Sequence, residues 1–277
     1  MKTLENHTLI YDAECPLCNA YTQGFIKYKM LDINGRTAFQ QFDFDNNTEI
    51  DKTKAANKIV LFNSETNEIT YGLPSLIKII GFNYPNLAKL ANISVIHFLL
   101  SLLYSFISYN RKMIAPSKIT NEKSGNPSFN LPYRIAFIAC CAILVHVIVT
   151  WYFQSFLLPF MHLRFNLPDV VLFLAQFPFQ ALVFYLFKQN NFYDYAGQLA
   201  FVSALAAFGL LIAGVAFKVL LYFNFDIQFL GIITYGATFM FMFYEHLRRV
   251  KLYNCSIWIC VSWIVFRLLI YPLVFKF

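Results

Sequence analysis

Two cysteines near the start of the chain stand three positions apart, where a strand is expected to give way to a helix. The segment D-A-E-C-P-L-C places Cys15 and Cys18 shortly after Asp12. At this spacing, one helical turn brings two sulfur atoms within reach of a disulfide bond. Free N–H groups and the positive end of the helix dipole favour a thiolate on the first cysteine. The motif therefore predicts thiol–disulfide chemistry.

Each residue of the motif has a predicted role. We expect Cys15 to be the nucleophile, because it caps the helix and its pKa should be lowered. Cys18 lies one turn further along and should be more buried, so we expect it to resolve the mixed disulfide and release the partner. Asp12 closes the strand near both sulfurs and is a candidate acid or base for the proton of Cys18. This chemistry requires no bound cofactor.

The elements that must position the motif follow from local patterns. Helical spacing of apolar residues and Pro16 in the first turn predict a helix from Cys15 to Leu31. Later apolar runs flank polar, turn-rich segments and indicate further strands and one more helix. The predicted strands are Thr8–Asp12, Ala38–Phe42, Lys58–Phe62 and Ile69–Tyr71, the last two as a hairpin before a helix at Leu73–Ile80. Whether the strands pair in parallel or antiparallel is left open.

This arrangement resembles the DCC family, thioredoxin-like proteins assigned as thiol-disulfide oxidoreductases. The resemblance covers about residues 7–115 and rests on Asp12 with the two cysteines, on Tyr71-Gly72 after the hairpin, and on Tyr109-Asn110-Arg111 after an apolar helix. It implies a thioredoxin-like α/β domain with redox-active cysteines. Ala13 departs from the family, which usually has glycine directly after the aspartate.

The composition indicates a membrane protein. Hydrophobic residues make up 58% of the chain and charged residues only 13%. Residues 116–277 hold eleven Lys/Arg but only five Asp/Glu, and their long apolar runs predict an all-α transmembrane region of about five spans. The predicted spans are Ile135–Leu158, Val170–Phe187, Ala196–Tyr222, Phe229–Tyr244 and Ser256–Phe275.

One apolar stretch lies ahead of these spans. Ile93–Ser108 is shorter than the ~20 residues needed to cross hydrocarbon, so we interpret it as a helix that docks on the first domain. The alternative is an interfacial or re-entrant segment against the bilayer. The predicted organisation is a thioredoxin-like domain at 1–115, a linker at 116–132 and a multi-pass membrane region at 133–277.

Positive charges predict the orientation in the membrane. Basic clusters precede the first span and separate the fourth from the fifth: Arg111, Lys112, Lys118, Lys123 and Arg134, then Arg248, Arg249 and Lys251. Both should be cytoplasmic. We saw no secretory signal before the first domain. The protein is therefore expected in the inner cell membrane, with a cytoplasmic N-terminal domain and the C-terminus outside. Its expected partners are the lipid bilayer and a protein or small-thiol redox partner, not nucleic acid.

The leading hypothesis is a membrane-bound protein disulfide oxidoreductase. A redox sensor or regulatory domain attached to a membrane transport or sensor module is the alternative. A metal-binding module is a third, with His7 as the nearby extra ligand. Cys255 and Cys260 are candidates for electron exchange with the first pair, although packing is the simpler role. Polar residues expected at membrane depth or its edge are often functional, and here they are His146, Glu245, His246 and Arg267.

Overall fold

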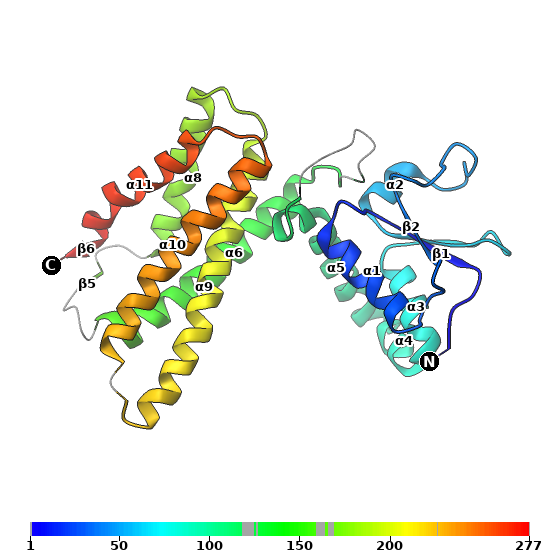
Figure 1. The fold of residues 1–277 in the computed structure, drawn as a ribbon, viewed down its shortest axis with the longest axis horizontal. Helices are drawn as coiled ribbons and strands as arrows, with labels where there is room; N and C mark the ends of the chain where they lie inside the picture. Colours follow the sequence, from blue (N-terminus) through cyan, green and yellow to red (C-terminus); the bar gives the residue numbers. More distant parts are fainter. Residues whose placement is uncertain are drawn as a thin grey trace. The chain divides into compact units, whose positions relative to one another are not determined.

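The structure is a computed structural model that describes residues 2–117, 125, 127–158, 164–165, 169–225 and 227–276. It divides into two compact units, Met1–Tyr133 and Arg134–Phe277. The first contains a small sheet with helices, and the second is helical (Figure 1). Residues 118–124 and 126 of the predicted linker lie outside the described residues. The domain boundaries 1–115 and 133–277 stay a prediction.

The first unit is built on a mixed four-stranded sheet in the order β2-β1-β3-β4. β1 pairs in parallel with β2 and antiparallel with β3, and β3 and β4 form the predicted antiparallel hairpin. The strands are β1 (His7–Tyr11), β2 (Arg36–Ala38), β3 (Val60–Asn63) and β4 (Ile69–Tyr71). The sheet and its helices confirm the thioredoxin-like α/β class for this unit.

Side chains alternate across the sheet and create two apolar layers. Leu9 and Leu61 face one layer, and Ile10 and Val60 face the other. The first layer is completed by α1 (Pro16–Lys27), α3 (Leu73–Asn83) and α5 (Ser94–Ile114), the second by α2 (Lys52–Asn57). Both cysteines of the motif belong to the first layer.

The predicted strand Ala38–Phe42 is wrong beyond its first residue. β2 ends at Ala38, because the amides of Gln41 and Phe42 both donate to the Ala38 carbonyl at 3.0 Å and form a turn. Phe39 is buried against Ile10 in the second apolar layer instead of extending the sheet. The apolar residues of this run therefore contribute to the core from a turn.

Gly72 occupies a backbone conformation that other residues avoid. It caps α3 with φ 70° and ψ −129°, and an added Cβ would lie 3.0 Å from Tyr104 Cε1. We expect Gly72→Ala to lower the free energy of unfolding by about 1–3 kcal/mol. The urea dependence of alkylation at the buried Cys18, which reacts little in the folded domain, measures this in the full-length protein.

Gly24 provides the matched control. It lies within α1, and an added Cβ would have no heavy atom within 4 Å. Gly24→Ala should therefore stabilise the unit by about 0.5–1 kcal/mol, as alanine does relative to glycine within helices. Similar unfolding curves for the two variants would contradict the strained conformation of Gly72.

The predicted docking helix is the first part of α5. It follows α4 (Pro85–Ala91) after a bend of 87°, and Tyr104 on its inner side packs against the core. The two helices together are apolar enough to form a broken span or a re-entrant loop. α5 therefore has an inner face on the sheet domain and an outer face suited to lipid.

The second unit consists mainly of helices packed along one another. α9 packs against α10, and α8 packs against α11 (Figure 1). A two-residue strand pair, β5 (Arg164–Phe165) and β6 (Phe275–Lys276), is antiparallel. The helical elements are α6 (Leu131–Tyr152), the π-helix η1 (Phe153–Leu157), α8 (Asp169–Leu186), α9 (Phe192–Tyr222), α10 (Gln228–Leu252) and α11 (Trp258–Val274).

The number of candidate membrane spans is two or three among the described residues, not five. Leu131–Leu157 and Phe192–Tyr222 are long and apolar enough, which supports the first and third predicted spans, and the α4–α5 pair is the optional third. The apolar parts of α8 and α11, Val171–Leu186 and Trp258–Ile270, have at most 17 residues. At 1.5 Å per residue, they fall short of a ~30 Å hydrocarbon core.

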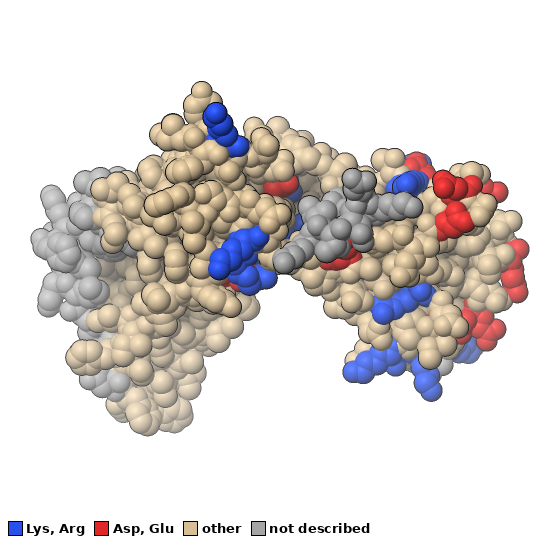
Figure 2. All heavy atoms as spheres, turned by 45° about the horizontal axis from the view of Figure 1, so that its top comes forward, with Lys and Arg blue, Asp and Glu red and all other residues tan. Residues whose placement is uncertain are grey.

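The remaining predicted span, Phe229–Tyr244, lies in α10, where polar residues interrupt the apolar sequence. α10 contains Thr234, Tyr235 and Thr238, and its last turns carry Glu245 and several basic residues. Figure 2 shows the corresponding contrast in charge: acidic and basic side chains gather on the first unit, whereas the second exposes mostly uncharged atoms on this face. The long apolar helices indicate membrane association of the second unit.

Candidate functional site

Cys15 stands at the N-terminus of α1, as the sequence predicts. It is the N-cap residue with extended backbone angles, and Pro16 follows at the first helical position. The Cys15 sulfur accepts a hydrogen bond from the backbone N–H of Cys18 at 3.2 Å. Because the first N–H groups of a helix have no partner within the helix, this cap is a favourable place for a negatively charged sulfur.

The two thiols have opposite pKa shifts. A hydrogen bond from the Cys18 thiol, helped by the Cys18 N–H and the charge of Arg111, lowers the pKa of Cys15 to about 7, although burial and Asp12 oppose the shift. The hydrogen bond to Cys15, together with burial, raises the pKa of Cys18 well above the ordinary thiol value. Near neutral pH, the thiolate of the pair is therefore on Cys15, which is partly ionised, and Cys18 stays a thiol.

The lowered pKa produces a modest gain in reactivity. A thiol with a pKa of about 7 is roughly half ionised at pH 7, against roughly 1% for an ordinary value of 9.0, which is about a 50-fold gain in thiolate. The less basic thiolate is about 8-fold less nucleophilic, so a net gain of about 6-fold remains. The low pKa also makes Cys15 a good leaving group.

The pKa difference predicts how the pair reacts with iodoacetamide. Alkylation of Cys15 in the full-length protein should rise with pH around a midpoint near 7, while Cys18 reacts little. Cys18→Ala should move the midpoint upward, because the largest stabilising contact of the thiolate is lost. Mass spectrometry of the tryptic peptide from Thr3 to Lys27 follows both residues apart from the other four cysteines. A midpoint near 9 in the unchanged protein would contradict this account.

The predicted difference in burial between the two cysteines does not appear in their solvent exposure. Cys15 is 1% exposed and Cys18 is 5% exposed, so the second thiol is not the less exposed one. Both pack in the apolar layer between the sheet and its helices. Because exposure does not separate their roles, the assignment of Cys15 as nucleophile rests on the helix cap and the pKa shifts.

Asp12 forms a buried ion pair. Its Oδ2 lies 3.3 Å from Arg111 Nη2, and both side chains are almost fully buried. Its Oδ1 accepts hydrogen bonds from the Gln40 side chain at 3.0 Å and from the Glu14 backbone N–H at 3.1 Å. No hydrogen bond joins the Asp12 carboxylate to Cys18 in the described part of the chain. Proton transfer between these two residues stays a prediction.

Arg111 links α5 to the site. Its guanidinium donates to the carbonyls of Ala56, at 2.9 Å, and of Gly125 in addition to pairing with Asp12. Sequence reasoning named Arg111 only within the family-like segment and the basic cluster, and missed this contact. The sequence did contain one signal for this ion pair. An arginine at the end of an apolar helix is expected to have a partner of opposite charge where it is buried.

The metal-binding alternative finds no ligand set in the part of the chain that the structure describes. No group of three or more His, Cys, Asp or Glu side chains there is arranged to hold an ion. The ring nitrogens of His7 instead contact the Glu5 carbonyl at 2.6 Å and the Asn63 side chain at 3.3 Å. Both ring nitrogens of His7 are therefore engaged in contacts at β1 and at the neighbouring strand β3.

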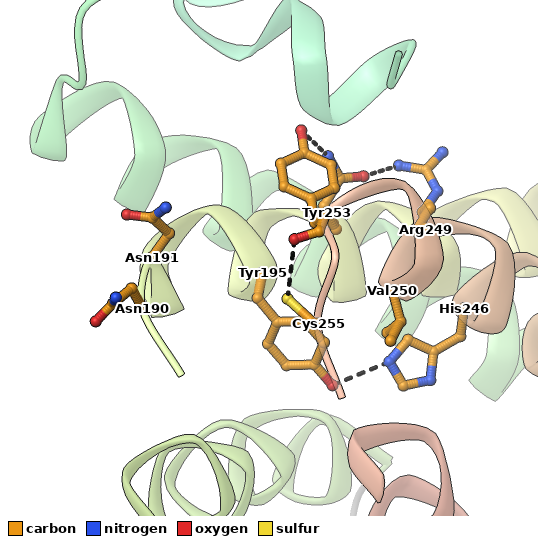
Figure 3. Close-up of a pocket in the computed structure, with 9 residues that line it drawn as sticks. Asn190, Asn191, Tyr195, His246, Arg249, Val250, Tyr253 and Cys255 are labelled. Atoms are coloured by element: carbon orange, nitrogen blue, oxygen red, sulfur yellow. Dashed lines mark hydrogen bonds between the residues drawn. The ribbon is translucent and has the colours of Figure 1, made fainter. Parts of the chain in front are cut away.

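His246 and Cys255, two of the residues singled out in the second unit, line a small pocket of about 30 Å³, which is space enough for a water molecule. Figure 3 shows His246 pointing to Tyr195, with Nε2 3.0 Å from the hydroxyl, and Cys255 with its sulfur 3.6 Å from the Tyr253 carbonyl. Glu245 bonds Arg248 and Arg249, each at 2.7 Å. These contacts lie within the helical unit, and they leave the buried His246 Nδ1 without a hydrogen-bond partner among the described residues.

The other two residues have local partners. His146 Nδ1 lies 3.4 Å from the Thr150 hydroxyl, one turn along α6. The guanidinium of Arg267 lies over the Trp263 ring at 5.4 Å. Cys260 is buried in the apolar cluster that contains Trp263. Neither residue joins the cluster in Figure 3, and Cys260 has the packing role that its spacing favoured.

Comparison with protein families bears directly on the first unit. Residues 9–115 match the family described as DCC1-like thiol-disulfide oxidoreductase. These residues form a DCC1-like domain. The match includes Asp12, Cys15, Cys18 and Arg111, so the ion pair and both thiols belong to the domain, and the predicted resemblance is confirmed. Neither the curated proteins nor the solved structures contain a match to the chain.

Proposed function

We propose that the protein is a membrane-bound thiol-disulfide oxidoreductase in which Cys15 and Cys18 exchange a disulfide with a protein or small-thiol partner. The observation that carries this proposal is the Cys15 sulfur at the start of α1, hydrogen-bonded by Cys18 and with its pKa lowered to about 7. A thiolate held at neutral pH next to a second thiol is the chemical requirement for rapid exchange.

Reduction of a partner disulfide by the dithiol takes two steps. The Cys15 thiolate attacks one sulfur of the partner disulfide, forms a mixed disulfide and releases the other sulfur as a thiolate, which takes up a proton. Cys18 then loses its proton and attacks the Cys15 sulfur, which closes the Cys15–Cys18 disulfide and releases the reduced partner. Asp12 is the proposed acceptor of the Cys18 proton, and Arg111 holds its carboxylate in place.

A cytoplasmic location of the domain is part of the proposal. Arg134, at the start of α6, pairs with Asp194, at the start of α9, at 3.2 Å. Near the end of α10, Arg249 donates to Gln198 of α9. These contacts put both helix starts and the basic end of α10 at one end of the helical unit. The positive-inside rule assigns such an end to the cytoplasm. An external C-terminus stays a prediction.

Catalysed reduction of insulin by dithiothreitol tests the proposal with the full-length protein in lipid nanodiscs. We expect the rate to rise in proportion to the amount of protein. The alternative, a redox sensor coupled to a membrane module, predicts a Cys15–Cys18 disulfide that forms and is reduced without turnover of a partner. Failure to accelerate insulin reduction or the exchange of small disulfides would contradict the oxidoreductase.

A further inference from the structure

An apolar pocket of about 470 Å³ lies beside the thiol pair, inside the first unit. Cys18 is part of its wall, and Cys15 is not. Apolar and aromatic side chains of α1, α3 and α5 make up most of the rest, among them Tyr21, Ile80, Tyr104 and Ile107. Because Cys18 is only 5% exposed, the pocket gives a small ligand access to a sulfur atom that is otherwise almost fully buried.

The pocket has one polar corner. Arg111 lines it and is 5% exposed, and no hydrogen-bond acceptor contacts its Nε–H among the described residues. Leaving a buried charged donor without an acceptor is costly. A ligand with an oxygen acceptor next to an apolar body would satisfy this donor and fill the space.

The surface around the pocket is suited to lipid. Ile107 lines the pocket from α5 and is itself 36% exposed, so the wall continues onto the outer face of that helix. Large exposed apolar side chains cover α4 and this face of α5: Leu87, Leu90, Val95, Phe98, Leu99, Leu102 and Leu103. The α4–α5 pair is also apolar enough to enter a bilayer. A ligand dissolved in lipid can therefore reach the pocket without crossing water.

From these observations we propose that the pocket binds a membrane-soluble quinone, which accepts electrons from the Cys15–Cys18 dithiol. This inference rests on the proposed function and runs the exchange in the oxidising direction: a partner dithiol reduces the Cys15–Cys18 disulfide, and the quinone then accepts the two electrons of the resulting dithiol. A quinone has the required properties: an apolar ring and tail, carbonyl oxygens that accept the Arg111 Nε–H, and the capacity for two electrons and two protons that dithiol oxidation releases.

The reaction between the dithiol and the quinone balances in electrons and in protons. The Cys18 sulfur adds to a ring carbon, and its proton passes to a quinone oxygen. The Cys15 thiolate then attacks the Cys18 sulfur, so that the S–S bond forms and the C–S bond breaks with its electron pair left on the ring. The second quinone oxygen takes up one proton, which balances the proton that Cys15 released on ionising, and the hydroquinone is complete. One dithiol is oxidised to one disulfide for each quinone reduced.

A pocket-filling variant tests the proposal. The reduced full-length protein in nanodiscs is mixed without oxygen either with decylubiquinone or with oxidised glutathione, and disulfide formation is followed on the tryptic peptide from Thr3 to Lys27. Ile107→Trp fills the pocket from α5, and Leu103→Trp makes the same change on the same helix outside the pocket lining. Ile80→Trp fills the pocket independently from α3.

We expect both pocket variants to lower the ratio of the quinone rate to the glutathione rate by about tenfold or more, and Leu103→Trp to keep the ratio of the unchanged protein. Hydroquinone should form in equal amount to the disulfide. Oxidation by glutathione but not by the quinone, or an equal ratio in all variants, would overturn the quinone site while leaving the oxidoreductase intact. No oxidation by either compound would overturn the proposed function itself.

Discussion

Cys15→Ser is expected to reduce disulfide exchange to the uncatalysed rate, a loss on the order of 10³-fold or more, because removal of a nucleophile costs about as much as removal of the whole catalytic group. A serine hydroxyl stays protonated at pH 7 and does not attack a disulfide. The same position in the unchanged protein has a thiolate with a pKa of about 7. Insulin reduction by the full-length variant measures the loss.

Cys18→Ser is the informative counterpart. It keeps the nucleophile and a hydroxyl donor beside it, but it removes the thiol that resolves the mixed disulfide. A covalent adduct between Cys15 and a small disulfide should therefore accumulate in Cys18→Ser and be absent from Cys15→Ser. An adduct in the opposite variant would reverse the two roles. This is a real test, because solvent exposure, which is low for both thiols, does not decide between them.

Arg111→Met should have the largest effect on stability of any single change at the site. The substitution leaves the Asp12 carboxylate buried without its cationic partner, and breaking such a pair costs about 3–5 kcal/mol. It also removes a charge that lowers the pKa of Cys15, so the pKa of that thiol should rise and its alkylation midpoint should move to higher pH. Urea-dependent alkylation of Cys18, which reacts little in the folded domain, reports the stability of the domain.

Two variants separate the ion pair from the loss of volume and hydrogen bonds. In the double variant Asp12→Asn with Arg111→Met, the unpaired charge is gone, so the combined cost should be clearly smaller than the sum of the single costs. Arg111→Lys keeps the charge but loses the fork that also reaches the carbonyls of Ala56 and Gly125, so partial destabilisation is expected. Strict additivity would show that the two residues do not stabilise each other.

The features that the sequence predicts well depend on short-range physics. β1 ends one residue before Asp12, Cys15 caps α1, and β3 and β4 form a hairpin, because periodicity, capping and turn residues act over a few positions. β2 was misplaced because its limits depend on pairing with β1, and Leu9 faces Arg36 across 27 positions of sequence. A run of apolar residues does not specify such a partner.

The sequence predicted which residues carry the thiol chemistry, but not which side chains surround them. Asp12 and Arg111 are separated by 99 positions, and their pairing depends on how α5 returns to the sheet. The burial of Cys15 likewise depends on helices contributed by distant segments. Hydropathy alone overestimated the membrane spans, because an apolar helix of 17 residues or fewer packs equally well inside a helical unit.

The central claim, that Cys15 and Cys18 form a redox-active pair, is tested most directly by an equilibrium redox titration of the full-length protein. The protein is held at a series of glutathione or dithiothreitol ratios and alkylated, and the mass of the tryptic peptide from Thr3 to Lys27 is read at each ratio. The account predicts one reversible two-electron transition between a dithiol and a disulfide, absent from Cys15→Ser. A peptide that stays fully reduced, or fully oxidised, at every ratio would contradict it.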